Sequence, residues 1–207
     1  MSDYSVYLVM GPDVVDPVAM AVSAARGGVT VIQWRDKTGS TSEQVELVSE
    51  LVAATDVPIL VNDRADVAVA AGAAGVHVGH GDLTPAQARR IVGADAIVGV
   101  TIHTADEAEA ADGAPIDYAS VGGVFATSSK TNTHPPIGID GFAAIAERLR
   151  RARSLPIIAI AGIDVARAKA LRAAGADGVA VMSAITKADD PAAAAKALRS
   201  VFGGVPA

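Results

Sequence analysis

The sequence predicts an α/β protein, a (β/α)8 TIM barrel, from the alternation of two kinds of segment, from their number and from an internal repeat. Short runs rich in Val and Ile alternate with Ala-rich segments whose apolar residues recur at helical spacing. Strands that alternate with helices pair in parallel, and strands covered on both faces are apolar throughout, as these runs are. Eight runs occur, at residues 6–10, 29–34, 58–62, 75–79, 96–102, 118–122, 156–160 and 178–182. Helical spacing is clearest at residues 42–54, 84–92, 141–151 and 165–174.

An internal repeat supports the barrel more directly than the number of runs does. Residues 70–78 read AAGAAGVHV, residues 173–181 read AAGADGVAV, and the runs that open at Pro58 and Pro156 also correspond. The copies lie about half the chain apart, which is the spacing of a barrel built from two similar halves of four β/α units. The alternative interpretation of the repeated letters is a common pattern, a glycine that ends a helix and is followed by a strand.

A doubly wound open sheet is the alternative fold for the same alternation of segments. The glycine-rich motifs that such sheets use for nucleotides are missing: no G-x-G-x-x-G opens a helix after the first run, and G-x-x-x-x-G-K-[ST] does not occur. Dinucleotide and P-loop sites are therefore excluded.

Composition narrows the class of protein. We expect one domain over residues 1–207, because domains of this length are common. With 51% hydrophobic residues, 3% aromatic residues and a net charge of −6, the chain is not disordered, and neither nucleic acid nor a membrane is an expected partner. The absence of cysteine excludes disulfides, thiolate catalysis and iron–sulfur clusters. No signal peptide or membrane span is recognisable, so we expect a cytoplasmic protein.

Polar residues that close the runs are informative, because the chemistry of a barrel lies at the carboxyl ends of its strands. After the second run, Gln33, Arg35 and Lys37 share one face at a period of two. Arginine offers a planar fork and lysine a point charge, a combination that suits a multiply charged phosphate. The alternative is a solvated loop in which Asp36 pairs with its neighbours.

Two carboxylates close neighbouring runs and form a candidate metal site. The third run ends in Asn62 and Asp63, and Asp82 follows the fourth. Two carboxylates at adjacent rims can hold one hard divalent cation that also binds phosphate oxygens, which is typical of Mg²⁺. Alternatively Asp82 caps a helix, although Thr84 followed by Pro85 makes a better helix start.

Two histidines lie in the same stretch. His77 and His80 form an H-x-x-H pair, but no third ligand for zinc lies nearby in the sequence. We therefore interpret the pair as hydrogen-bonded histidines of the barrel rather than as metal ligands.

The remaining run ends carry hydroxyls, one lysine and mostly small residues. Thr101 closes the fifth run. The sixth run opens the longest connection, which predicts a mobile anion-binding lid or, alternatively, a plain flexible loop. Small residues after the seventh and eighth runs allow backbone N–H groups to approach a phosphate, where barrels commonly bind one. The residues concerned are Thr127, Ser128, Ser129 and Lys130 in the long connection, and Ala161, Gly162, Met182 and Ser183 after the last two runs.

Together these groups predict two anionic subsites and no pair of nucleophile and base. Such a site suits a reaction between two phosphorylated small molecules in which one loses pyrophosphate. No base is needed if the attacking atom is already a neutral nucleophile.

Over nearly the whole chain the sequence resembles the thiamine phosphate synthases, barrel enzymes that join a pyrimidine diphosphate to a thiazole phosphate with loss of pyrophosphate. The resemblance rests on seven motifs that are specific in combination. They are QWRDK at residues 33–37, VNDRADVA from Val61, GVHVGHGDL from Gly75, GVTIH from Gly99, DYASVGGVFATSSKTNT from Asp117, AIAGI from Ala159 and GADGVAVMSAI from Gly175.

The resemblance implies a transferase that uses Mg²⁺, with small phosphorylated substrates as its partners, and it leaves a homo-oligomer open. It implies catalytic roles for Arg35, Lys37 and Lys130, and a magnesium site at Asp63 and Asp82. It implies a pyrimidine diphosphate subsite at Gln33, Arg35, Lys37, Asn62 and Lys130, with Thr101 at the position of a small hydroxyl, and a thiazole phosphate subsite at Thr127, Ser129, Gly162, Met182 and Ser183. Trp34, Asp36 and Ser128 are included as substrate-binding residues within the same motifs.

The chemistry that the resemblance implies is dissociative. Pyrophosphate leaves first, a pyrimidinylmethyl cation forms, and the thiazole nitrogen captures it. A protein that stabilises the leaving group and positions two partners needs no base, in agreement with the residues found.

Six positions depart from the usual pattern of the family, and two alternative functions follow the same resemblance. Ala161 would crowd the phosphate site and His80 would change the surroundings of the metal. A related isomerase, a thiazole tautomerase, uses a histidine where this chain has Gly123. A non-catalytic regulator that binds thiazole phosphate would not need both carboxylates. The departures are Trp34 for Leu, His80 for Gln, Thr101 for Ser, Gly123 for Pro, Ser129 for Thr and Ala161 for Gly.

Overall fold

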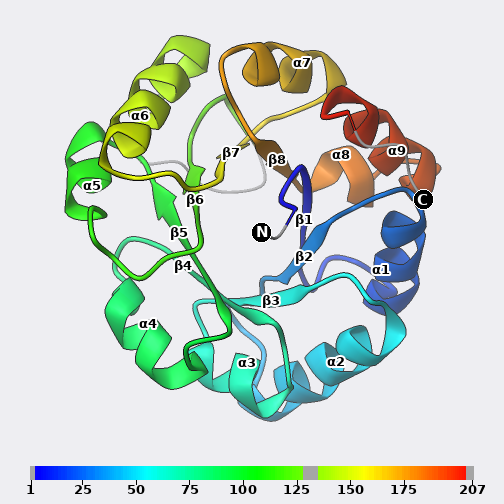
Figure 1. Cartoon of the computed structure of the whole chain (residues 1–207). Helices are drawn as coiled ribbons and strands as arrows, with labels where there is room; N and C mark the ends of the chain where they lie inside the picture. The colour runs from blue at the N-terminus through cyan, green and yellow to red at the C-terminus, as the bar shows by residue number, and fades with distance from the viewer. Residues whose placement is uncertain (1–2, 128–134, 204–207) are drawn as a thin grey trace.

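The computed structural model describes residues 3–127 and 135–203, and these residues form a closed barrel of eight parallel strands. Figure 1 looks down the barrel, with the strands at the centre and the helices in an outer ring. The strands pair in chain order, and β8 closes on β1. They are β1 (Val6–Met10), β2 (Val31–Trp34), β3 (Ile59–Asn62), β4 (Gly75–Val78), β5 (Ile97–Ile102), β6 (Tyr118–Val121), β7 (Ile157–Ile160) and β8 (Gly178–Val181).

The predicted (β/α)8 barrel is confirmed, and the open sheet is excluded by the pairing of β8 with β1. Each strand lies within one of the eight runs picked out by their apolar residues. The assignment of all 207 residues to one domain stays a prediction.

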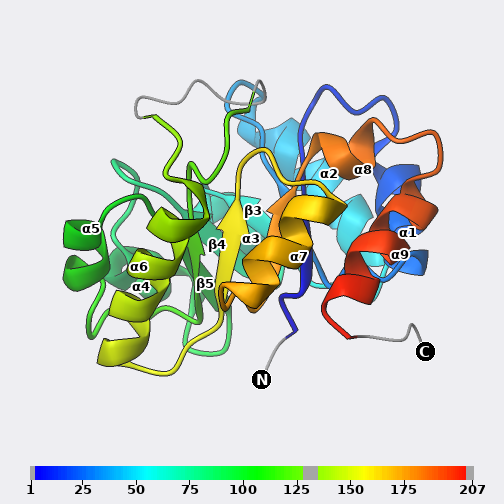
Figure 2. The ribbon, with the colours of Figure 1, turned by 90° about the horizontal axis from the view of Figure 1, so that it is seen from above.

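Helices cover the outside of the barrel between successive strands. Figure 2 shows the barrel from the side, with β7 pointing toward the end at which α8 lies. Among the described helices, none combines the length and the apolar character needed to cross a membrane. They are α1 (Pro17–Arg26), α2 (Thr41–Ala54), α3 (Ala65–Ala70), α4 (Pro85–Val92), α5 (Ala105–Ala110), α6 (Gly138–Ala152), α7 (Val165–Ala173), α8 (Ser183–Thr186) and α9 (Pro191–Val201).

The sequence explains where several helices begin. Ser40 and Glu43 cap α2 reciprocally, and Thr84 and Gln87 do the same at α4, so that the free N–H groups of each first turn find acceptors. The predicted start at Thr84 is thereby confirmed. Helices α1 and α9 each begin with an aspartate cap followed by a proline, which suits the first helical position because it needs no donor there.

The strands lie between two apolar layers, one outside and one inside the barrel, and their residues are buried almost throughout. The outer layer, between the strands and the helices, is built mainly from Ala, Val, Ile and Leu. The inner layer fills the barrel and contains the tyrosines of the core. Its buried members are Tyr4, Tyr7, Val9, Val31, Leu60, Tyr118, Ile158 and Ala180. Because the inner layer fills the lower barrel, we look for a ligand site above it, at the carboxyl ends of the strands.

Candidate active site

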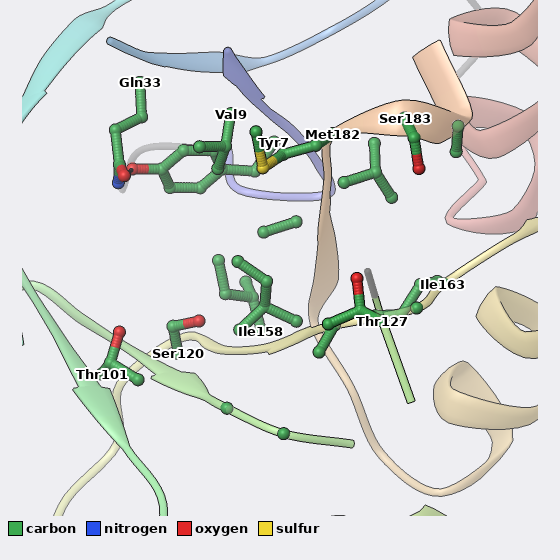
Figure 3. A pocket seen from close by; sticks show the side chains of 18 of the residues that line it. Tyr7, Val9, Gln33, Thr101, Ser120, Thr127, Ile158, Ile163, Met182 and Ser183 are labelled. Atoms are coloured by element: carbon green, nitrogen blue, oxygen red, sulfur yellow. Dashed lines mark hydrogen bonds between the residues drawn. The ribbon is translucent and has the colours of Figure 1, made fainter. Parts of the chain in front are cut away.

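A cavity of about 440 Å³ opens at the carboxyl ends of the strands, and every strand contributes to its wall or floor. Tyr7 and Ile158 belong to both the inner layer and the cavity lining, so they form its floor. Figure 3 shows Gln33, Tyr7, Thr101 and Ser120 toward one side, and Thr127, Ile163 and Ser183 toward the other. The cavity is thus large enough for small molecules and has two chemically different sides.

The structure brings most of the described predicted residues to this cavity. Those that line it are Gln33, Arg35, Asn62, Thr101, Thr127, Gly162, Met182 and Ser183. Ser128, Ser129 and Lys130 lie outside the described residues. The roles of all these residues stay predictions, since a position in the lining does not by itself establish a contact with substrate.

Five of the described predicted residues do not line the cavity: Trp34, Asp36, Lys37, Asp63 and Asp82. Trp34 is buried in the outer layer, because successive side chains of a strand face opposite ways and Gln33 faces inward. Asp36 accepts hydrogen bonds from the backbone N–H groups of Thr38 and Gly39, at 2.8 and 2.9 Å, which lower the pKa of its carboxyl. The Asp36 side chain therefore stabilises the turn after β2 and does not point into the cavity.

Asp63 and Asp82 come together at the rim, as adjacent strands predict. Burial raises the pKa of the Asp63 carboxyl, and contact with Asp82 raises it further, while Lys37 acts in the opposite direction. Lys37 donates to Asp63, and Asp82 accepts from the N–H of Gly79 at 3.0 Å. The Asp63 backbone is left-handed, with φ 62°, which turns the chain sharply after β3. The Lys37 ammonium group and the Asp82 carboxylate thus both lie close to Asp63.

The acidic pair fits a hard divalent cation. Within residues 3–127 and 135–203, no group of three or more acidic or histidine side chains could hold a metal. Two carboxylates suit Mg²⁺ even so, because that ion keeps several waters and commonly takes further oxygens from substrate phosphates. The repulsion between Asp63 and Asp82 is the kind that a bound cation relieves.

A line of hydrogen bonds crosses the barrel interior under the cavity. Gln33 Nε2 donates to Tyr7 Oη at 2.7 Å, and Tyr7 Oη lies 2.9 Å from Tyr118 Oη. His77 joins Tyr118 Oη through Nδ1 and Thr101 Oγ1 through Nε2, both at 2.7 Å. The interpretation of His77 as a hydrogen-bonded barrel histidine is therefore confirmed. Sequence reasoning missed both tyrosines, although their position inside two apolar strands was a signal.

Two buried polar atoms in the lining have no hydrogen-bond partner among the described residues. They are Asn62 Nδ2 and Ser120 Oγ. A buried donor without an acceptor is costly, so such atoms favour a ligand that supplies the missing partner. Asn62 was predicted as a substrate contact, whereas Ser120 was missed because serine within an apolar run reads as an ordinary strand residue.

The side of the cavity at β7 and β8 contains two consecutive residues whose backbone has positive φ. Ala161 and Gly162 both have positive φ, of 99° and 64°. Arg167, which sequence reasoning also missed, lines the cavity, donates to the Gly162 carbonyl and lies 4.6 Å above the Phe125 ring. A cation beside a glycine turn and the start of α8 makes this side suitable for an anion.

Comparison with known proteins agrees with the motifs and the barrel. The sequence matches the family described as thiamine monophosphate synthase over residues 6–185. The chain belongs to the thiamine monophosphate synthase family. It is 47% identical to a thiamine-phosphate synthase of Agrobacterium fabrum, over 92% of this chain and 88% of the relative. A second such synthase, of Chloroflexus aurantiacus, is 46% identical over 88% of this chain and 84% of the relative.

A solved structure of a relative extends the agreement to three dimensions. The thiamine phosphate pyrophosphorylase of Pyrococcus furiosus superposes with a TM-score of 0.86 at 31% identity, over 97% of this chain and 96% of the other. The predicted thiamine phosphate synthase family, the predicted transferase class and the predicted synthase activity are confirmed by these relatives. Their names favour the synthase over the tautomerase and the regulator.

The structure shows the surroundings of three positions that depart from the usual thiamine phosphate synthase pattern. Ala161 takes a left-handed conformation that glycine adopts without strain. His80 is largely exposed, and its Nδ1 lies 3.7 Å from Glu107 Oε1. Thr101 keeps a hydroxyl in the cavity, where it meets His77. Threonine at position 101 therefore still supplies the hydroxyl that serine would supply, with one additional methyl group.

Proposed function

We propose that this protein condenses 4-amino-2-methyl-5-hydroxymethylpyrimidine diphosphate with thiazole phosphate to give thiamine phosphate and pyrophosphate, by a dissociative mechanism assisted by Mg²⁺. The observation that carries the proposal is the meeting of Lys37, Asp63 and Asp82 just after β2, β3 and β4, close in sequence to Arg35 and Asn62, which line the cavity. This cluster contains one cation and two carboxylates, as a site for a diphosphate and its metal requires.

On the side of β2 and β3, the chain's own residues would hold the pyrimidine diphosphate. Arg35 lines the cavity beside the rim and offers a planar fork for phosphate oxygens. Lys37 already lies against Asp63 and adds a second positive charge, and we assign Lys130 to the same diphosphate. The Asn62 amide supplies an unpaired buried donor. Such groups stabilise charge as it develops on departing pyrophosphate.

Asp63 and Asp82 would hold the Mg²⁺. When bound, the ion supplies positive charge to the diphosphate oxygens and so makes pyrophosphate a better leaving group. Lys37 would keep Asp63 oriented toward the rim.

On the side of β7 and β8, the chain would hold the thiazole phosphate. Gly162 and the Met182–Ser183 backbone line the cavity there, and Thr127 adds a hydroxyl. We assign Ser128 and Ser129 to the same subsite. Glycine at position 162 allows both the positive φ of the turn and the close approach of the Ala126 carbonyl, which a Cβ would meet at 2.3 Å. The thiazole nitrogen would then face the pyrimidine carbon across the cavity.

The two subsites together would accomplish the reaction by positioning. The bond to pyrophosphate breaks, its electron pair leaves with the pyrophosphate oxygen, and the thiazole nitrogen donates a pair to the resulting carbon cation. No proton has to be removed, so no base is needed. Holding the partners in one cavity replaces a collision in solution with an oriented encounter. Because both substrates are charged metabolites, we further propose that the protein acts in the cytoplasm.

The direct test is a product assay with the pure protein, Mg²⁺ and both substrates. We expect thiamine phosphate and pyrophosphate in equal amounts, detected by mass spectrometry and a pyrophosphate assay. Isomerisation of a thiazole without condensation would contradict the proposal, as would the absence of any product.

A further inference from the structure

The line of hydrogen bonds under the cavity has a role that the condensation chemistry does not require. It runs from Gln33 on β2 through Tyr7, Tyr118 and His77 to Thr101 on β5. Four of these side chains line the cavity, whereas Tyr118 is fully buried. Both ends of the line therefore face a ligand, and its middle is shielded from solvent.

The Gln33 end gives the line its direction. Gln33 Nε2 donates to Tyr7 Oη, so this hydroxyl oxygen is already an acceptor. Among the described residues, its other hydrogen-bond partner is Tyr118 Oη, 2.9 Å away. A buried hydroxyl proton without an acceptor is unfavourable. The Tyr7 proton therefore points at Tyr118.

The direction of donation continues from Tyr7 to Tyr118 and His77. Tyr118 accepts from Tyr7, so its own proton points at His77 Nδ1, at 2.7 Å. A neutral imidazole that accepts at Nδ1 carries its proton on Nε2, which donates to Thr101 Oγ1 at 2.7 Å. Burial raises the pKa of both phenols, so both keep the protons that the line needs.

The direction leaves an acceptor at the Gln33 end of the line and a donor at the Thr101 end. One N–H of Gln33 Nε2 is used by Tyr7, which holds the amide so that its Oε1 remains as an acceptor, while Thr101 retains the proton of its hydroxyl. Neither group has another hydrogen-bond partner in residues 3–127 and 135–203. An aminopyrimidine has the complementary pattern, since its exocyclic amine donates and its ring nitrogens accept. A pyrimidine with a carbonyl in place of the amine presents an acceptor where the amine donates.

We infer that Tyr7, Tyr118 and His77 are positioning residues that select an aminopyrimidine, by fixing Gln33 Oε1 as an acceptor and the Thr101 hydroxyl as a donor. The inference rests on the proposed function and adds to it the source of discrimination at the pyrimidine ring. A free glutamine amide can rotate to present either its oxygen or its nitrogen, so it rejects neither ring. Discrimination requires that rotation be made unfavourable.

The packing around Tyr118 keeps the line in place. A side chain at Gly99 would put its Cβ 2.1 Å from a carbon of the Tyr118 ring, so glycine is needed for the ring to lie there. The Tyr4 ring lies on Tyr118 with centroids 4.5 Å apart, and the His77 ring stacks at 5.6 Å. A hydroxyl held between such neighbours has little freedom to change partners.

The test compares Tyr7→Phe and Tyr118→Phe with the unaltered chain. Each change removes one hydroxyl from the line and keeps the ring. Competition between the aminopyrimidine diphosphate and its 4-oxo analogue gives the ratio of their kcat/KM values. We expect each variant to lower that ratio on the order of tenfold, mainly through KM of the amino substrate, because one oriented hydrogen bond is lost.

Tyr4→Phe is the matched control, since it removes a hydroxyl from a ring on Tyr118 that does not line the cavity. We expect this variant to retain the selectivity of the unaltered chain. Circular dichroism and thermal unfolding would establish that all three variants fold. Unchanged selectivity in folded Tyr7→Phe or Tyr118→Phe would overturn the inference, as would an equal loss in the control.

Failure of the proposed function would be separately visible. If the unaltered chain makes no thiamine phosphate, calorimetry with the two pyrimidine diphosphates and Mg²⁺ still measures the preference directly. The role of the line would be supported without turnover if the unaltered chain binds the amino compound more tightly and both Tyr7→Phe and Tyr118→Phe lose that preference. Equal affinities for the two compounds would overturn it.

Discussion

The two sides of the cavity are built from different parts of the chain. On the side of β2 to β6, side chains supply the polar groups, and a hydrogen-bonded line fixes several of them. The side of β7 and β8 instead has two consecutive residues of positive φ and the start of α8, whose backbone groups are candidates for holding an anion. The side chains concerned are Gln33, Asn62, His77, Thr101 and Ser120, and the backbone positions are Ala161, Gly162, Met182 and Ser183.

This difference matches two recognition tasks. Oriented side chains discriminate among rings that differ in one donor or acceptor, because a mismatch leaves a buried group unpaired. Backbone N–H groups and a nearby arginine hold a phosphate by its charge and leave the rest of the ligand less constrained. We therefore expect substitutions on the two sides to affect the two substrates separately.

The largest expected effect on the rate comes from the acidic pair, Asp63 and Asp82, which lies on the side of β2 to β6. Asp63→Asn removes one charge and keeps a residue type that tolerates the left-handed backbone at this position. We expect Mg²⁺-dependent kcat to fall by about 100-fold or more, since charge stabilisation of the leaving group is lost. Calorimetry should show unchanged affinity for thiazole phosphate.

The control for this change is Asp56→Asn, the same substitution in an exposed turn before β3. It should leave both the rate and the magnesium dependence unaltered. If Asp63→Asn kept full activity, Asp63 would not be a ligand of the Mg²⁺.

A second prediction tests whether the hydrogen-bonded line depends on the space at Gly99. Gly99→Ala forces its Cβ into the Tyr118 ring, so the ring has to move. We expect the free energy of unfolding to fall by about 2 kcal/mol, as in other overpacked cores. Chemical denaturation measures this value.

A double-mutant cycle serves as the control for the Gly99 prediction. In a Tyr118→Ala background the clash is absent, so Gly99→Ala should cost much less there. An equal cost in both backgrounds would show that Tyr118 is not the reason for this glycine.

The third prediction concerns the side of the cavity at β7 and β8. Gly162→Ala places a Cβ 2.3 Å from the Ala126 carbonyl oxygen at a φ of 64°. We expect KM for thiazole phosphate to rise about tenfold, the effect of about 1.4 kcal/mol of lost binding, while KM for the pyrimidine diphosphate changes little. Steady-state kinetics with each substrate varied in turn would measure both.

Gly72→Ala is the matched control for the Gly162 variant. It has a similar φ of 67°, but its Cβ would meet no atom within 4 Å. It should lower stability without changing either KM. A larger effect of Gly162→Ala on the pyrimidine diphosphate than on thiazole phosphate would reverse the assignment of the two sides.

The smallest expected effect is at Ala161. Its φ of 99° is costly for a residue with a Cβ, so Ala161→Gly should raise the free energy of unfolding by about 1 kcal/mol. Ala126→Gly, in an exposed loop position of negative φ, should lower it instead because the unfolded chain gains freedom. A loss of stability in Ala161→Gly would mean that the side chain contributes packing that outweighs the strain.

Much of the fold could be predicted from the sequence, because local patterns determine it. The run at 6–10 became β1 without change, and the cap at Thr84 began α4 as expected. The meeting of Asp63 with Asp82 was also predictable, since both follow neighbouring strands whose carboxyl ends share one rim.

The rest of the site depends on pairings that no local pattern specifies. Tyr7 and Tyr118 meet across the barrel although they are 111 positions apart in the sequence, and the place of the Tyr118 ring depends on space left by Gly99. Trp34 illustrates the opposite case. A motif taken as a continuous stretch included it, but alternation along the strand turns its side chain away from the cavity.

The most direct test of the two-sided site is a crystal structure of the protein with Mg²⁺, inorganic pyrophosphate and thiazole phosphate bound. We predict pyrophosphate and the metal beside Lys37, Asp63 and Asp82, and the phosphate of the thiazole at Gly162 and Ser183. Thiazole phosphate at the acidic rim, or both anions on one side of the cavity, would contradict the account.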